Sequence, residues 1–567
     1  MTKISSNIST EGILRKEMSI HGRLKYFSDW IAGVLIIIAL AVLVHVSFPW
    51  SFISGLLWIY CLLLVLTVIL RPKWWLFIVI FSLPVLGFIP NWQGVAGIAG
   101  LSGFNDGSFV SLSHLVEMKH LGHNLSGIND KIFSIPLFGL PLSMGIWWIR
   151  QKDILLPRSI ISISVFFSLM IFSAISVVFR FYEISLVPFH ITFIGQDFMR
   201  EVLPKATKLV SYKVVPRKLI SITAIITLAN IEGVLLFLVI YNVIKKGITI
   251  KVASNALLAA VVVFTSFGFA QMMGWFPSFT TVPGRFESTF LDLGESSVFC
   301  GLSTAFTLGL IFSTDNRKVM IFYGLVFVFA LLGFSVVKSR TSLVGFTGSL
   351  ICLSLIYRKL RSADSTTKKI LFFFVYALVA FLIIVSIPKV NHYVQGRLDK
   401  GSFGMRVMTS LDFTRMSLDG ISSGRITLWK HCLVVWKKHP IMGCGMGQLP
   451  WELLKTKYKE YPWPADNQFI LELAELGVVG LLAFLWMIYA LIKDISMSLH
   501  LYMGEKKTIM NYLPWLCGFI SIILEFFTIF VLYYRNVILI VWATFAIAVA
   551  LSPGSGYQLE GPKEKSV

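Results

Sequence analysis

The chain is divided into many apolar runs of about 17–25 residues, the length that an α-helix needs to cross a hydrocarbon core of about 30 Å. Because no water in that core can pair with backbone groups, repeated runs of this length predict a bundle of helices. Composition agrees, since 56% of the residues are hydrophobic and 14% are charged, against about 45–50% and about 25% in soluble domains. The sequence therefore predicts an all-α polytopic membrane protein with a bundle of about 12–14 transmembrane helices.

The apolar runs also predict a topology. The basic N-terminus is expected to be cytoplasmic, and the basic connections after residues 70, 149, 244, 357 and 493 then also fall inside. The basic stretch 180–218 falls outside, so it is alternatively an interfacial amphipathic segment. The runs themselves cover residues 29–49, 52–70, 74–90, 133–149, 159–179, 219–244, 252–274, 297–313, 319–337, 342–357, 370–387, 477–493, 511–532 and 537–552.

This topology divides the chain into five parts. The first thirty residues lack a cleavable signal pattern, so we expect the first span to remain as an anchor. The longest polar block lies outside and carries most of the candidate site residues. The parts are a cytoplasmic tail (1–28), a bundle of about eleven spans (29–387), a large periplasmic loop (388–476), the C-terminal transmembrane helices (477–552) and a cytoplasmic tail (553–567).

Charge and cysteine content exclude several classes of protein. The net charge is +21, but Lys and Arg lie in short clusters between apolar runs and no nucleic-acid motif accompanies them, so no nucleic-acid partner is expected. The six cysteines have no CxxC spacing, and no His/Asp/Glu set has metal-ligand spacing. We therefore expect no disulfide framework, no metal site and no cofactor.

Three cations near the outer ends of predicted spans are candidates for anion binding. Lys338 and Arg340 lie in a turn between two apolar helices, where they either snorkel to the interface or bind a phosphate. Arg285 precedes a span, and its alternative role is a local salt bridge to Glu287. Ionisable residues near membrane depth are functional candidates by default.

The large loop contains a predicted helix that begins near Arg425. Its apolar residues recur every three or four positions from Ile426 to Trp436. A cation at a helix N-terminus is locally unfavourable, and an anionic ligand would offset that cost. The glycines of GCGMG that follow form either a phosphate-binding loop or a simple turn. His439, before Pro440, is a further candidate, with a structural role at the helix end as the alternative.

The stretch PADNQF places carboxylates beside the next span. Asp466 is either a general base or only a helix N-cap, and Asn467 is a candidate for substrate binding. Glu472 and Glu475 lie on one face of the following helix. We expect that face to be solvated or to line a cavity.

Three separated stretches together resemble the O-antigen polymerase and O-antigen ligase superfamily of membrane glycosyltransferases. They are GRFESTFLDLGESSVFCGLS, SRTSLVGFTGSL, and GRITLW with HPIMGCGMGQL and ADNQFILELAELGVVGLL, and they fall within residues 283–493. The ligases share a His-Asn pair followed after nine residues by Gly and after two more by Gly. This chain keeps that spacing from Asn467 to Gly477 and Gly480, but Asp466 replaces the histidine.

The resemblance implies roles for individual residues. Arg340 and Arg425 fall on the two arginine positions thought to hold the diphosphate of a polyprenyl-linked donor, and Arg285 is assigned to the same task. Asp466 stands where the ligases have their proposed base, and we count it with Arg340 and Arg425 as catalytic. Lys338, Asn467, Glu472 and His439 complete the predicted substrate-binding set.

The histidine replacement favours a polymerase, which joins undecaprenyl-diphosphate-linked repeat units of a surface polysaccharide at the periplasmic face. The alternative within the superfamily is a ligase that transfers the glycan to lipid A core or another acceptor. A flippase for lipid-linked oligosaccharide is the alternative of a different class, although the chain shows neither the internal repeats nor the midplane charges typical of transporters. The expected location is the bacterial inner membrane. The expected partners are the lipid-linked glycan, membrane lipid, and a chain-length regulator or flippase.

Overall fold

The computed structural model describes residues 52–85, 139–151, 153–180, 214–248, 250–273, 288, 290, 293–337, 339–359, 425–454, 465–501, 506–533, 535–550 and 557–558. Helices account for almost all of this part, apart from a two-residue antiparallel pair, β1 (Leu155–Leu156) with β2 (Tyr557–Gln558). The helices are α2 (Phe52–Leu70), α3 (Pro72–Val85), α7 (Gly139–Arg150), α8 (Ile160–Arg180), α10 (Val214–Lys245), α11 (Ile250–Met272), α12 (Leu293–Ser313), α13 (Arg317–Val337), α14 (Arg340–Lys359), α19 (Arg425–Lys438), α20 (Leu449–Leu454), α21 (Gln468–Leu501), α22 (Lys506–Glu525), the 3-10 turn η5 (Val531–Tyr533) and α23 (Arg535–Ala550).

The all-α membrane class is confirmed. Within the described ranges, six helices are long and apolar enough to cross a membrane, and they belong to α8, α10, α11, α12, α13 and α21. Shorter apolar helices lie in α2, α3, α14, α22 and α23. The predicted runs 29–49 and 370–387, and residues 181–213, lie outside the described residues. One predicted run is interrupted, because α22 ends at Glu525 and a turn precedes η5 instead of a continuous span over 511–532.

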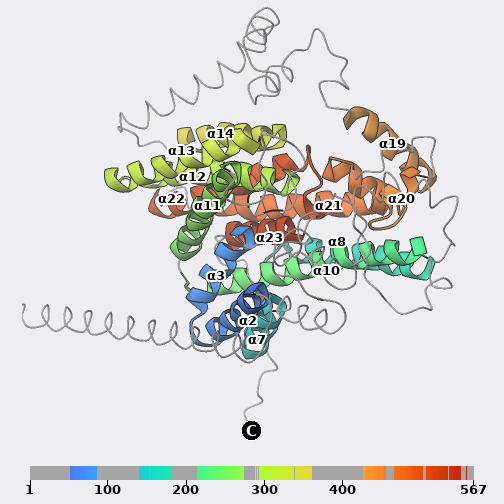
Figure 1. Cartoon of the computed structure of the whole chain (residues 1–567), viewed down its shortest axis with the longest axis horizontal. Coiled ribbons are helices and arrows are strands. Elements are labelled where there is room, and N and C mark those ends of the chain that lie inside the picture. The colour runs from blue at the N-terminus through green and yellow to red at the C-terminus, as the bar shows by residue number, and fades with distance from the viewer. Residues whose placement is uncertain are drawn as a thin grey trace, which may run out of the picture.

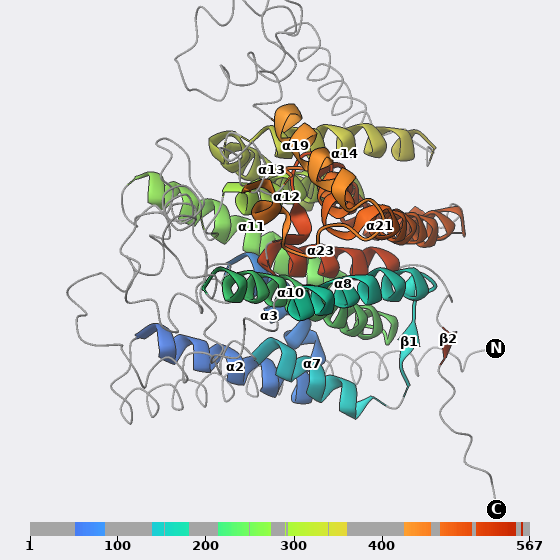
Figure 2. The same ribbon diagram turned by 90° about the vertical axis from the view of Figure 1, so that its right-hand side faces the viewer.

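Helix α23 forms the centre of the bundle. Figures 1 and 2 both place it between α12, α13 and α14 on one side and α8 and α10 on the other. Every residue of α23 from Asn536 to Ala550 is buried, and so is every residue of α12 from Glu295 to Phe312. These two helices are therefore enclosed by protein and do not face lipid.

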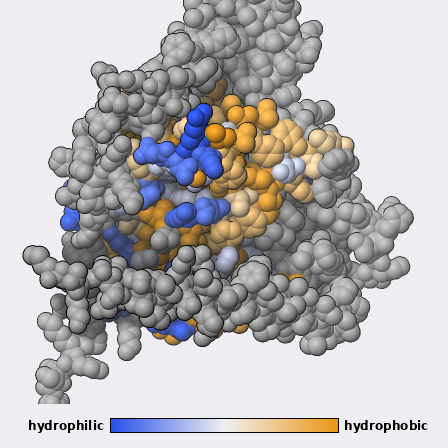
Figure 3. Space-filling view, turned by 90° about the vertical axis from the view of Figure 1, so that its left-hand side faces the viewer, coloured by the Kyte–Doolittle hydropathy of each residue, from blue (hydrophilic) through white to orange (hydrophobic). Residues whose placement is uncertain are grey.

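The basic connections between helices meet at one end of the bundle. Arg150, at the end of α7, donates to the carbonyl of Ile69 near the end of α2 (2.9 Å). The side chain of Asn242 in α10 exchanges two hydrogen bonds with the backbone of Leu155, and Ser159 N donates to Asp494 of α21 (3.0 Å). The connections after residues 70, 149, 244 and 493 therefore share an end, as the charge pattern predicts. Figure 3 shows hydrophilic side chains gathered together on one face of the molecule, with hydrophobic surface beside them.

Small residues allow the central helices to approach closely. A Cβ placed on Gly309 of α12 would lie 2.6 Å from Cα of Pro514 in α22. Further along the same pair, a Cβ on Gly301 would lie 1.9 Å from Oε1 of the buried Glu525. Close backbone approach through glycine is a common way to pack helices in lipid, where apolar surface alone gives no preference for protein over lipid.

This contact predicts the effect of a single methyl group. We expect Gly309→Ala to lower the thermal unfolding temperature of the detergent-solubilised protein, because the backbone of Pro514 cannot move away as a flexible side chain could. Gly324→Ala on α13 is the matched control, since a Cβ there has nothing within 4 Å and Ala is the better helix former. Equal unfolding temperatures for the two variants would contradict the close packing of α12 on α22.

Candidate active site

The structure brings two of the predicted site residues together from distant parts of the sequence. Arg425 is the first residue of α19, and its Nε lies 3.4 Å from Oδ2 of Asp466, just before α21. Both side chains remain partly exposed, at 26% and 36%. Close by, Trp429 Nε1 donates to the carbonyl of Ala465 (2.7 Å) and fixes α19 beside the start of α21. The ion pair therefore lies at the meeting point of two helix N-termini.

The pair compensates an unfavourable position for a cation. Arg425 lies at the positive end of the α19 dipole, and the carboxylate of Asp466 supplies the negative charge that this position favours. Burial raises the pKa of Asp466 above its ordinary value, and the Arg425 guanidinium opposes that rise by charge and hydrogen bonding. Asp466 is thus moved toward the range in which a carboxylate acts as a base.

The N-cap of α21 is Asn467, so Asp466 has a different position from a simple cap. Asn467 Oδ1 accepts from the amide of Ile470 (3.1 Å), and Asn467 Nδ2 donates to the carbonyl of Phe527 (2.9 Å). Asp466 adopts a left-handed backbone conformation with φ of 44°, which Asp tolerates better than most residues. Asn467, predicted as a substrate-binding residue, makes contacts that orient the start of α21.

A second residue fastens this start to the connection between α22 and α23. The amide of Gln468 donates to the carbonyl of Phe526 (2.8 Å), and its side-chain Oε1 accepts from the amide of Leu532 (2.9 Å). Sequence reasoning missed Gln468, because its partners are more than fifty residues away and no local pattern identifies them. The connection after α22 therefore holds Asp466 in place through its two neighbours.

Glu472 and Glu475 do not lie on a solvated face, which was one of the two alternatives expected for them. Glu472 is only 2% exposed and Glu475 only 1% exposed. Glu472 Oε1 accepts from Gln468 Nε2 (2.7 Å) within α21. Glu475 accepts from two amides of the glycine loop, which we define as residues 440–449: Gly447 N at 2.8 Å and Leu449 N at 3.3 Å. Both carboxyl groups thus face protein.

Helix α21 is broken at Gly477, and the glycine loop fills the break. Gly477 has φ of 71° and ψ of −167°, so the helical hydrogen bonds stop there. Cys444 N and Gly445 N donate to the carbonyls of Ala474 and Glu475, both at 2.9 Å. In the opposite direction, the amide of Val478 donates to the carbonyl of Pro440 (2.9 Å) and that of Val479 to Ile441 (3.3 Å). The break is paired by another segment of the same chain.

These contacts explain the glycines and correct the phosphate-loop alternative. A Cβ on Gly443 would lie 2.2 Å from the carbonyl carbon of Glu475, and a Cβ on Gly477 would lie 2.1 Å from the oxygen of Ile441. The loop amides at 444, 445, 447 and 449 are used by α21, and Met446 N donates to Ser173 Oγ (3.0 Å). The glycines serve close backbone packing, and their amides bond within the protein rather than to an anion.

The remaining candidates are distributed unevenly. His439 follows the last residue of α19, about 20 Å along the helix from Arg425 at about 1.5 Å per residue, and its backbone closes the helix end. Arg285 and Lys338 lie outside the described residues. Arg340 begins α14, and its side chain is likewise outside the description. The start of α14 is at the same end of the bundle as Asp466. A Cβ on Gly345 of α14 would contact Glu525, and the carbonyl of the next residue, Phe526, accepts from the Gln468 amide at the start of α21.

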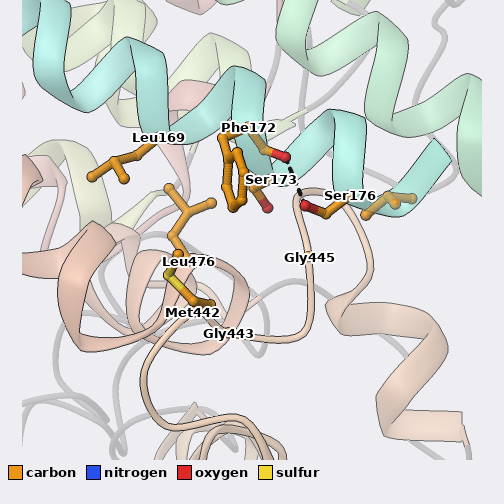
Figure 4. A pocket seen from close by; sticks show the side chains of 9 residues that line it. Leu169, Phe172, Ser173, Ser176, Met442, Gly443, Gly445 and Leu476 are labelled. Atoms are coloured by element: carbon orange, nitrogen blue, oxygen red, sulfur yellow. Dashed lines mark hydrogen bonds between the residues drawn. The ribbon is translucent and has the colours of Figure 1, made fainter. Parts of the chain in front are cut away.

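An apolar cleft lies beside the glycine loop, between the loop and α8 (Figure 4). It has a cavity volume of about 70 Å³ and is lined by Leu169, Phe172, Ser173, Ser176, Val177, Met442, Gly443, Gly445 and Leu476. Its two serine hydroxyls bond within the protein: Ser176 donates to the carbonyl of Phe172 (2.9 Å) and Ser173 accepts from Met446 N (3.0 Å). The cleft therefore offers hydrocarbon rather than polar surface.

The fold and this site define a polytopic helical membrane protein with a charged pair at one end of its bundle. Residues 325–485 match the model of a family described as O-antigen ligase, which confirms the resemblance to the O-antigen polymerase and ligase superfamily. The matched segment contains α14, α19, the glycine loop and the first half of α21. No curated protein sequence matches the chain. This segment of the chain is thus similar to proteins of the O-antigen ligase kind.

The geometry of the α21 start generates a stability prediction. We expect Asn467→Ala to lower the free energy of unfolding by about 1–2 kcal/mol, because the cap to Ile470 is lost. Asn467→Ser keeps an oxygen that can cap the start of α21 and adds no charge beside the Phe527 carbonyl, so its loss should be smaller. Denaturant unfolding in detergent measures both. A larger loss for the Ser variant would show that the cap is elsewhere.

Proposed function

We propose that this protein is a glycosyltransferase that polymerises undecaprenyl-diphosphate-linked repeat units of a surface polysaccharide at the outer face of the bacterial inner membrane. The observation that carries the proposal is the Arg425–Asp466 pair, inside the segment that matches the O-antigen ligase family. The pair combines a permanent cation, suited to a diphosphate, with a carboxylate suited to accept a proton.

The proposed reaction assigns one task to each member of the pair. Asp466 takes the proton of the acceptor hydroxyl as its oxygen bonds to the anomeric carbon of the donor sugar. The bond between that carbon and the phosphate oxygen breaks, and the polyprenyl diphosphate leaves with the electron pair. Arg425 stabilises the charge that develops on the diphosphate, a kind of contact whose removal in other enzymes costs about 2.7–4 kcal/mol. No step requires a metal ion or another cofactor.

Arg425 can serve both its neighbour and a substrate. A guanidinium has five N–H donors in a planar fork, and the contact to Asp466 is made through Nε. We assign Arg340, with Lys338 and Arg285, to the remaining diphosphate charge, because α14 begins at the same end of the bundle. The apolar cleft beside the glycine loop suits the prenyl chain of the donor, since its lining presents hydrocarbon.

The replacement of the ligases' histidine by Asp466 favours the polymerase over the ligase. The two activities leave different products on a gel of surface polysaccharide. Deletion of a polymerase gene leaves single repeat units on an anchored core, whereas deletion of a ligase gene leaves long chains that are unattached. The second outcome would replace the polymerase proposal with the ligase alternative.

Substitutions in the pair test the chemistry in the same assay. We expect Arg425→Ala to abolish chain extension and Asp466→Asn to reduce it by about 10² or more, the lower range for general acid–base catalysis. Asn tolerates the left-handed conformation at position 466 as well as Asp does, so the variant should insert and fold normally. Lys437→Ala, an exposed cation in the last turn of α19, is the matched control and should extend chains normally.

The pH dependence of transfer provides a separate prediction. Because Asp466 must be deprotonated to act as a base, the rate should rise with pH through the pKa of this carboxyl, which burial raises and Arg425 lowers. The rate measured with purified protein and a lipid-linked donor should therefore have an acidic limb. In Asp466→Asn that limb should disappear from the residual rate. A limb that persists in this variant would assign the base to another group.

A further inference from the structure

We infer that Glu475 is a positioning residue, whose carboxylate ties the glycine loop to α21 and thereby keeps Arg425 in register with Asp466. The inference rests on one part of the proposed function, namely that the Arg425–Asp466 pair performs the transfer. Glu475 itself is only 1% exposed. It lies nine residues after Asp466, at the other end of the first half of α21, and so it does not contact the pair.

The position of Arg425 relative to Asp466 depends on two segments, α19 with the glycine loop and the first half of α21, which contact each other at both ends. Arg425 and Asp466 open α19 and the first half of α21, respectively. At the other end of α19 the chain enters the glycine loop, and the loop pairs with α21 around Gly477. A shift of the loop along α21 therefore moves α19 and displaces the guanidinium relative to the carboxylate.

Glu475 is the side chain that fixes this second junction. Its Oε2 accepts from Gly447 N (2.8 Å) and its Oε1 from Leu449 N (3.3 Å), so one carboxylate holds two amides on the last part of the loop. The amides of Cys444 and Gly445 bond to carbonyls of α21, and these bonds fix the middle of the loop. Without the carboxylate, Gly447 N and Leu449 N would lose their acceptors in a buried place, which is costly.

The same loop is held from its other side by the bundle. Met446 N donates to Ser173 of α8 (3.0 Å), and the Met446 carbonyl accepts from Thr223 Oγ1 of α10 (2.6 Å). Gln448 Nε2 donates to the same Thr223 hydroxyl (3.0 Å). The glycine loop that Glu475 ties to α21 is therefore also joined, through Met446 and Gln448, to α8 and α10 of the membrane bundle.

The test uses Glu475→Gln, which keeps one acceptor oxygen and turns an NH₂ group toward the second amide. Spin labels at Lys430→Cys on α19 and Phe527→Cys in the connection after α22 report the position of α19, since both sites are exposed. Cys352 is replaced by Ser beforehand, because it is half-buried whereas the other five cysteines are buried. The matched control is Glu472→Gln, whose carboxyl bonds within α21 and not to the loop.

We expect the inter-label distance distribution to widen in Glu475→Gln and to stay narrow in Glu472→Gln. Transfer should fall by about 10²-fold in the Glu475 variant, the loss that a misplacement of about 1 Å produces. The acidic limb of the rate should also move to higher pH, because Arg425 then lowers the pKa of Asp466 less. A merely structural role would reduce the rate at every pH and leave the limb in place, and would overturn the inference.

The outcomes separate the inference from the proposed function. A narrow distance distribution in Glu475→Gln overturns the positioning role and leaves the catalytic pair standing. A widened distribution with normal transfer overturns the catalytic pair and the positioning role with it. If Glu475→Gln fails to insert, Glu475→Asp is measured instead, because its shorter side chain keeps the carboxyl group but cannot reach both amides.

Discussion

Every backbone amide and carbonyl at membrane depth must find a partner within the protein, and the site depends on how this chain meets that requirement at Gly477. A membrane helix that stops and restarts exposes carbonyls on one side of the break and amides on the other. Here the glycine loop supplies both partners through four backbone hydrogen bonds, and Glu475 adds two more. Glycine is needed at positions 443 and 477 because any Cβ would collide with the facing backbone.

These hydrogen bonds join the glycine loop to α21. The loop is the continuation of α19, so fixing the loop also fixes the helix that begins with Arg425. The opposite end of the same unit is fixed by Asn467 and Gln468, which bond to the connection after α22. Asp466 lies between these anchors, in a left-handed conformation that its neighbours maintain. The charged pair is thus preorganised by uncharged contacts around it, which is what electrostatic catalysis requires.

The sequence predicted the fold well because each span carries its own signal. Runs such as 159–179 and 252–274 correspond within a few residues to α8 and α11, since apolar length in lipid is decided locally. The pairing of Arg425 with Asp466 was predictable only through the family resemblance. The burial of Glu472 and Glu475 was not, because a carboxylate on an amphipathic face looks solvated until the segment that covers it is known. Gly477 within an apolar run was the one local sign of the break.

The break in α21 bears on the choice between an enzyme and a flippase. Discontinuous helices are typical of transporters, where freed carbonyls and helix ends coordinate the coupling ion or substrate. In this chain the carbonyls of Ala474 and Glu475 accept from Cys444 and Gly445, and the Glu475 carboxylate accepts from Gly447 and Leu449. The break is therefore occupied by the protein's own loop, while the partly exposed ion pair lies at Asp466, eleven residues before Gly477, and at Arg425 beside it. A polar group that bonds to its own chain holds a structure in place, and a partly exposed ion pair is where a substrate can exchange contacts. The division of roles between the two ends of this half-helix fits an enzyme better than a carrier.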